Sequence, residues 1–153
     1  MTTILIDADA CPVVSETIQI SKQFNFDCIL ICDTAHEMHR EGAETIIVSK
    51  GADAVDFVLV NKVKKGDIVV TQDYGLAAMV LAKQGHPIDQ NGRLYTNDNI
   101  DQLLYARHKA QKVRMAGGRL RGPKKRSKVN NETFEISLKE LCEKISVNNE
   151  DQS

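Results

Sequence analysis

Two carboxylates follow a short apolar run near the start of the chain. Residues 4–6 are Ile, Leu and Ile, and Asp7 and Asp9 come next. A second apolar run at 68–70 is followed in the same way by Asp73, just before a helical pattern. Carboxylates this close together repel one another unless a cation or a shared proton relieves the repulsion. The pattern favours a cation site at the ends of two buried strands, and the alternative for each Asp is a cap on the following helix.

A further pair of carboxylates lies in the segment 52–64, whose apolar residues recur at helical spacing. Asp53 and Asp56 are three positions apart and share one face of that expected helix. The helix follows a third apolar run, so its start is expected at the same sheet edge as the other acids. The helix dipole alone would also favour Asp there. The candidate metal ligands for Mg²⁺ or Mn²⁺ are Asp7, Asp9, Asp53, Asp56 and Asp73, of which Asp7, Asp9, Asp56 and Asp73 are candidate catalytic residues, with Thr71 in support.

The other residues able to do chemistry give weaker signals. His36 and His39 form His-Glu-Met-His, which lacks the His-Glu-x-x-His spacing of a zincin. Cys11 lies near an expected helix N-terminus, where the pKa of a thiol can fall far enough to make it a nucleophile. No Cys-x₅-Arg phosphatase loop supports that interpretation. The four Cys lack Cys-x-x-Cys spacing, so neither a zinc ribbon nor a disulfide framework is expected.

Apolar runs alternate with helical patterns along the chain. This alternation predicts an α/β fold, a three-layer α/β/α sandwich with a mainly parallel sheet. The expected strands are 4–6, 27–32, 45–48, 68–71 and either 86–88 or 94–96. The expected helices are 12–24, 52–64, about 76–84, 99–116 and about 137–147. Strands one and four are expected to be neighbours, because their acid-bearing ends converge only at the switch point of such a sheet.

Length and composition predict a single domain spanning 1–153. The chain has 153 residues, of which 42% are hydrophobic, enough to bury a sizeable core. It contains no run of about 18 apolar residues, and its start lacks the basic region and apolar stretch of a secretory signal. We therefore expect no membrane partner and a cytoplasmic location.

A net charge of −1 hides an uneven distribution. Residues 1–106 carry 8 Lys and Arg against 15 Asp and Glu, whereas the basic segment, residues 107–128, carries 10 Lys and Arg and no acid. This favours a nucleic-acid partner, and a solvated basic run is the alternative. The candidate nucleic-acid-binding residues are Arg107, Lys109, Lys112, Arg114, Arg119, Arg121, Lys124, Lys125, Arg126 and Lys128. Beyond them, Ser137-x-x-Glu140 predicts a capping box at the start of the last helix.

Several blocks of the sequence resemble one family of bacterial proteins. They are Ile-Leu-Ile-Asp-Ala-Asp-Ala-Cys-Pro at 4–12, Gly-Ala-Asp-Ala-Val-Asp at 51–56, Gly-Asp-Ile-Val-Val-Thr-Gln-Asp-Tyr-Gly-Leu-Ala at 66–77, Gly-Arg-Leu-Tyr-Thr-Asn at 92–97 and Gly-Gly-Arg-Leu-Arg-Gly-Pro-Lys-Lys-Arg at 117–126. From residue 4 to about 128, the chain is similar to the YaiI/YqxD family. That family in turn resembles the PIN-like nuclease superfamily.

The resemblance implies both a fold and a chemistry. The PIN-like pattern implies acids from strand one, a mid-chain helix and strand four, which hold a divalent metal for phosphodiester hydrolysis. Asp7, Asp56 and Asp73 match those positions. Asp9 and Asp53 are additional to the minimal pattern, and a further acid that the superfamily carries after strand four has no clear equivalent.

These observations lead to a functional hypothesis. We expect a metal-dependent nuclease that uses Mg²⁺ or Mn²⁺ to hydrolyse phosphodiester bonds, with RNA as its substrate. Two alternatives remain open. One is a phosphatase of the haloacid-dehalogenase type with Asp7 as nucleophile and Asp9 as acid or base. The other is a nucleic-acid-binding protein without catalytic activity.

Overall fold

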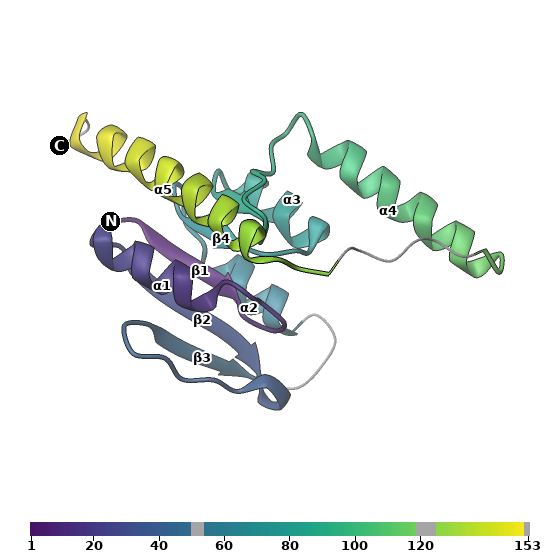
Figure 1. Cartoon of the computed structure of the whole chain (residues 1–153), viewed down its shortest axis with the longest axis horizontal. Coiled ribbons are helices and arrows are strands. Elements are labelled where there is room, and N and C mark those ends of the chain that lie inside the picture. The colour runs from purple at the N-terminus through teal and green to yellow at the C-terminus, as the bar shows by residue number, and fades with distance from the viewer. Residues whose placement is uncertain (50–53, 119–124, 152–153) are drawn as a thin grey trace.

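Five parallel strands form one sheet in the order β3-β2-β1-β4-β5 (Figure 1). The computed structural model describes residues 1–49, 54–118 and 125–151. The strands are β1 (Thr3–Asp7), β2 (Asp27–Asp33), β3 (Glu44–Val48), β4 (Ile68–Val70) and β5 (His86–Ile88). The predicted α/β sandwich with a parallel sheet is confirmed, and β1 and β4 are neighbours as expected. The switch point of the sheet therefore lies between β1, which ends in Asp7, and β4, which is followed by Thr71.

Alternation of side chains along β1 divides the core between the two faces of the sheet. Ile4 and Ile6 are fully buried in the cluster that contains the apolar side of the first and last helices. Leu5 points the other way, into a second cluster with Leu59 and Leu76. Because both faces are covered, the central strands consist of continuous apolar residues rather than an apolar–polar alternation.

Helices cover both faces of the sheet. The helices are α1 (Val14–Gln23), α2 (Ala54–Lys62), α3 (Tyr74–Ala82), α4 (Ile100–Met115) and α5 (Lys128–Asp151), with a short 3₁₀ turn, η1, at Thr34–His36. Helices α1 and α5 lie together over one face, and α2 and α3 lie over the other (Figure 1). No helix in the described ranges is long and apolar enough to cross a membrane.

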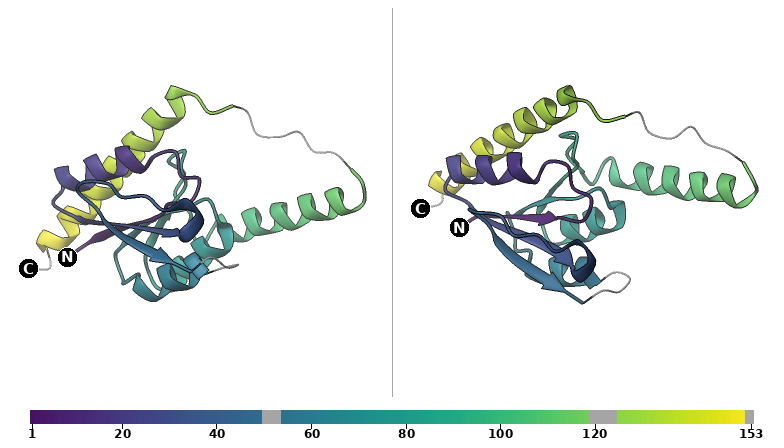
Figure 2. Two further views of the ribbon diagram at one scale, coloured as in Figure 1. Left: turned by 90° about the horizontal axis from the view of Figure 1, so that it is seen from below. Right: turned by 60° about the horizontal axis from the view of Figure 1, so that its bottom comes forward.

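The apolar contacts of helix α4 with the body come from its first turns. Ile100, Leu103 and Leu104 pack on α3 through a small apolar cluster. From Tyr105 to Gly118 the side chains are exposed, with Ala110 the one intermediate residue. Both views in Figure 2 show this helix extending away from the sheet as an arm.

The expected start of the last helix needs correction. The predicted capping box at Ser137 is wrong, because α5 already begins at Lys128 and Ser137 lies within it. The Ser137 hydroxyl donates instead to the backbone carbonyl of Gly92. Gly92 has φ +90°, and a Cβ there would lie 2.9 Å from the Thr133 carbonyl oxygen, so this loop approaches α5 closely.

The fifth strand lies at 86–88, one of the two expected positions. Of the other expected position, 94–96, only Leu94 contributes, as an isolated antiparallel bridge to Ile88.

Docking of α5 depends on a buried aromatic side chain. Phe134 is 0% exposed in the α1–α5 cluster, whereas Ile136, two positions on, is 61% exposed. We expect Phe134→Ala to lower the free energy of unfolding by about 3–5 kcal/mol, because the truncation leaves a cavity in the core. Urea denaturation would measure this, with Ile136→Ala as the matched control. Equal and small losses for both variants would contradict the described packing of α5.

Candidate functional site

Thr71 joins the acids of β1 and β4. Its hydroxyl donates to Oδ2 of Asp7 at 2.9 Å and accepts the backbone N–H of Asp73 at 3.0 Å. The Thr71 side chain is only 3% exposed, so water does not compete for these bonds. We call Asp7, Thr71 and Asp73 the acidic unit.

The sheet holds the acidic unit in place. Ile6 pairs with Val70, so the next residues, Asp7 and Thr71, lie side by side and on the same face of the sheet. The backbone of Thr71 is fixed twice: its N–H donates to the Ile88 carbonyl at 3.0 Å, and its carbonyl accepts the Tyr95 hydroxyl at 3.1 Å. These two bonds tie the backbone of Thr71 to β5 and to the segment that follows it.

Asp73 has a structural role in addition to any catalytic one. Its Oδ1 accepts the backbone N–H of Leu76 at 3.1 Å, which makes Asp73 the N-cap of α3. The same oxygen lies 3.7 Å from a guanidinium nitrogen of Arg107, the first residue of the basic segment. The capping interpretation is thus correct for Asp73, and it does not remove the residue from the acidic unit.

The pKa of Asp7 is strongly perturbed by its surroundings. This pKa is raised from the usual 3.8 to about 6. Burial of the carboxyl group is the main cause, the hydrogen bond from Thr71 acts against it, and the nearby charges of Asp9 and Asp73 add to it. A carboxylate in this environment is relieved by a cation. Asp7, Asp9 and Asp73 thus place like charges near one another.

A small hollow beside Asp7 is large enough for an ion. It measures about 40 Å³, more than the 10–15 Å³ that a single water needs. Its lining residues are Asp7, Asp9, Cys11, Val70, Thr71, Gln72 and Gln90. Carboxylate and amide oxygens dominate its polar lining, which is the donor set that Mg²⁺ and Mn²⁺ prefer. The residues present therefore fit a hard divalent ion.

Asp9 faces a neighbour that the sequence pattern did not single out. Its Oδ1 lies 3.5 Å from the backbone nitrogen of Asp33, at the end of β2, and 3.6 Å from Nδ1 of His36. In the described part of the chain, Asp9, Asp33 and His36 are the one group of three potential metal ligands within 4.8 Å of one another. The expected strand 27–32 stops one residue before Asp33, although β2, like β1, ends in an Asp after an apolar run. That shared pattern was the available signal.

Asp33 also has a local explanation. Its Oδ1 accepts the backbone N–H groups of Ala35 and His36, each at 2.9 Å, and so caps η1. The hydrogen bond with the His36 ring lowers the pKa of Asp33. A capped turn accounts for this cluster without a ligand.

The nucleophile interpretation of Cys11 is wrong. Burial raises the pKa of its thiol to about 11, so the thiol is neutral near pH 7. The charge of Asp7 contributes to this raised pKa, and the Val13 backbone hydrogen bond and Arg126 act against it. Cys11 serves as an uncharged wall of the small hollow.

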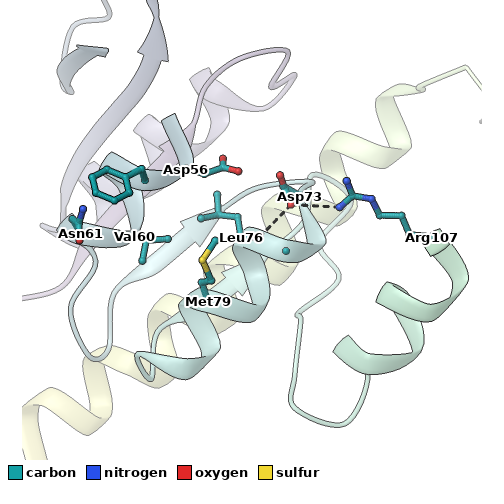
Figure 3. A pocket seen from close by; sticks show the side chains of 9 residues that line it. Asp56, Val60, Asn61, Asp73, Leu76, Met79 and Arg107 are labelled. Atoms are coloured by element: carbon teal, nitrogen blue, oxygen red, sulfur yellow. Dashed lines mark hydrogen bonds and ion pairs between the residues drawn. The ribbon is translucent and has the colours of Figure 1, made fainter. Parts of the chain in front are cut away.

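A larger groove lies between α2 and α3 (Figure 3). It encloses about 600 Å³ and is lined by Asp56, Phe57, Val60, Asn61, Asp73, Gly75, Leu76, Met79 and Arg107. Asp56, in the first turn of α2, lies on the side of the groove toward Asp73, and Arg107 lies beyond Asp73 (Figure 3). Asp56 and Asp73 therefore line this groove, whereas Asp7 and Asp9 line the small hollow and Asp53 lies outside the described residues.

The structure divides the candidate nucleic-acid-binding residues into groups. Lys109, Lys112 and Arg114 are exposed along the arm, and Lys125 and Lys128 are exposed before and at the start of α5. Arg119, Arg121 and Lys124 lie outside the residues that the structure describes.

Arg126 is engaged with the protein itself. Its Nε donates to Asn131 at 2.7 Å, and its two terminal nitrogens donate to Asn91 at 2.7 Å and to the Gln90 carbonyl at 2.6 Å. The Gln90 side chain accepts a hydrogen bond from Gln72 across the small hollow. Arg126 thus ties the start of α5 to the loop that borders the acidic unit.

Comparison with known proteins gives a family and no activity. A family model described as "Uncharacterized BCR, YaiI/YqxD family" matches residues 5–144. A UPF0178 protein of Exiguobacterium sibiricum is 56% identical over 138 residues, covering 90% of this chain and 94% of that protein. UPF0178 proteins of Ruminiclostridium cellulolyticum and Clostridium acetobutylicum are 50% and 46% identical, covering 88% and 90% of this chain and 88% and 95% of their own lengths. No solved structure matches the chain significantly.

The raised pKa of Asp7 predicts how stability varies with pH. Because the folded-state pKa of about 6 exceeds the usual 3.8, the folded protein binds the proton more tightly, and stability falls as pH rises from about 4 to above 6. Asp7→Asn removes this titration but keeps an acceptor for Thr71. In EDTA, we expect the free energy of unfolding of the variant, relative to that of wild type, to rise by on the order of 3 kcal/mol between pH 4 and pH 7.5.

Chemical denaturation at a series of pH values would measure the difference. Asp27→Asn, the same substitution at an exposed residue at the start of β2, is the matched control. A constant difference between Asp7→Asn and wild type would contradict the raised pKa.

Proposed function

This chain belongs to the YaiI/YqxD family, and from the geometry of its site we propose that it is a metal-dependent nuclease that hydrolyses phosphodiester bonds in RNA. The observation that carries the proposal is the acidic unit, in which Thr71 holds the Asp7 carboxylate and the Asp73 backbone together at the switch point. Open α/β sheets bind their ligands at this position. A PIN-like assignment agrees with acids at the ends of β1 and β4 and in α2.

Asp7 and Asp73 would hold Mg²⁺ or Mn²⁺, with Asp9 and Asp56 as direct or water-mediated ligands. When bound, such an ion lowers the pKa of a water and offsets charge on the scissile phosphate. The chain's own residues do the rest. Thr71 orients Asp7, and Arg107, beside Asp73, is placed to attract the phosphate. The exposed Lys and Arg of the arm supply long-range attraction to a polyanion that the acids would repel.

Removal of one ligand tests the metal site. We expect Asp7→Asn to weaken Mn²⁺ binding at least about tenfold, because the ion loses a charged oxygen donor. Isothermal titration calorimetry would measure the affinity, and Mn²⁺ should raise the melting temperature of wild type much more than that of the variant. Asp27→Asn, at the opposite end of the strands, is the control with the same charge change.

The same variants test the reaction. Wild type and Asp27→Asn should cleave single-stranded RNA in Mn²⁺, and Asp7→Asn should cleave it at least about 100-fold more slowly. Two other results would replace the proposal. A phospho-aspartate trapped on Asp7 would indicate the phosphatase, and RNA binding without cleavage in either metal would indicate a binding protein.

The arm gives a prediction about salt. If Lys109, Lys112 and Arg114 each touch a phosphate, their joint replacement by Ala should flatten the plot of log affinity against log salt by about 2 for single-stranded RNA. Fluorescence anisotropy in EDTA would measure it. Joint replacement of Lys64, Lys65 and Lys139, which are also exposed, is the control. An unchanged slope for the arm variant would show that the arm is merely solvated. Arg126 is left intact because its hydrogen bonds are structural.

A further inference from the structure

The groove between α2 and α3 exceeds what a metal ion requires. Its volume of about 600 Å³ is typical of sites for organic ligands. The charged groups gather at one end, where Asp56, Asp73 and Arg107 lie, while Leu76 and Met79 lie along it (Figure 3). Arg107 can pair with an anionic group at that end, and the apolar lining suits a flat or apolar body.

Two apolar side chains in the groove lining are open to solvent. Phe57 is 72% exposed and Met79 is 44% exposed, although both belong to helices whose other sides are buried. Their neighbours Val55, Leu59 and Leu76 supply the packing against the sheet. Phe57 and Met79 therefore contribute little to the core and are free to contact a ligand.

The groove is continuous with the acidic unit. Asp73 lines the groove, and its backbone N–H donates to the Thr71 hydroxyl that holds Asp7. A phosphate at the acidic unit and Arg107 thus has its attached sugar and base within reach of the groove. At the far end from Arg107, Asn61 offers an amide with both donor and acceptor groups (Figure 3).

We propose that the groove receives one unpaired base of the RNA strand whose phosphate lies at Asp73 and Arg107. Phe57 provides the stacking surface, because an aromatic face accepts any base. Met79 covers the apolar floor, and Asn61 meets the polar edge of the base. This inference rests on the proposed nuclease function and specifies its substrate as single-stranded, since a base held in a duplex is stacked and paired and cannot enter the groove.

Binding in EDTA tests the groove apart from cleavage. The probes are a labelled oligouridylate, an abasic strand of the same length, and the oligouridylate paired with oligoadenylate. We expect Phe57→Ala to weaken binding of the oligouridylate by about fivefold to 150-fold, the effect of losing one base–aromatic stack. Binding of the abasic strand should change less than twofold, and wild type should prefer the single strand to the duplex.

Three variants make the result specific. Phe57→Trp keeps a stacking surface and should bind like wild type. Ile136→Ala removes a comparably exposed apolar side chain on the opposite face and should have no effect. Phe57→Ala should also retain the wild-type melting temperature and Mn²⁺ affinity, because Phe57 is exposed and is not among the acids.

Contrary outcomes separate this inference from the nuclease proposal. If Phe57→Ala binds and cleaves the oligouridylate like wild type, the base does not occupy the groove, and the nuclease stands. If the abasic strand loses as much affinity as the oligouridylate, Phe57 does not stack on a base, and the inference is overturned. If wild type binds none of the probes, the groove inference and the choice of RNA both fail, while Mn²⁺ calorimetry still decides the metal site.

Discussion

The Thr71 hydroxyl is the contact on which the site depends. It donates to Asp7 and accepts from the backbone of Asp73, so one buried group fixes two acid-bearing strand ends. This bond exists because β1 and β4 pair in a register that sets Asp7 beside Thr71. A slip of one residue would turn Thr71 to the other face of the sheet and separate the acids. The position of the site is thus a property of the sheet.

Burial at the switch point gives Asp7 its chemical character. Its carboxyl group is removed from water between two other acids, which raises its pKa to about 6. Positive charge lies outside the site, on α4, whose exposed Lys and Arg run outward from a point next to Asp73. Arg107 is the link between the two, since it begins the basic segment and contacts the acidic unit.

The segment from Arg126 into α5 holds the loop that borders the small hollow. Arg126 donates to Asn91 and to the Gln90 carbonyl, and Gly92 allows the same loop to approach α5 closely. Phe134 then buries α5 against α1. The loop that carries Gln90 to the acidic unit is therefore held by residues more than thirty positions away, at 126 and 137.

The sequence by itself determined the sheet and the strand-end acids. A continuous apolar run indicates a buried strand, and the polar residues that follow it, Asp7 in one case and the segment before Asp73 in the other, mark where the strand ends. It also determined the basic segment, since the charge of a segment follows from its residue types and does not depend on the fold. Only the tertiary structure decided that Asp9 turns toward Asp33, that Arg126 is a structural clamp, and that α5 begins before Ser137. Those outcomes depend on contacts between distant segments, and local spacing carries no information about which partner a side chain will meet.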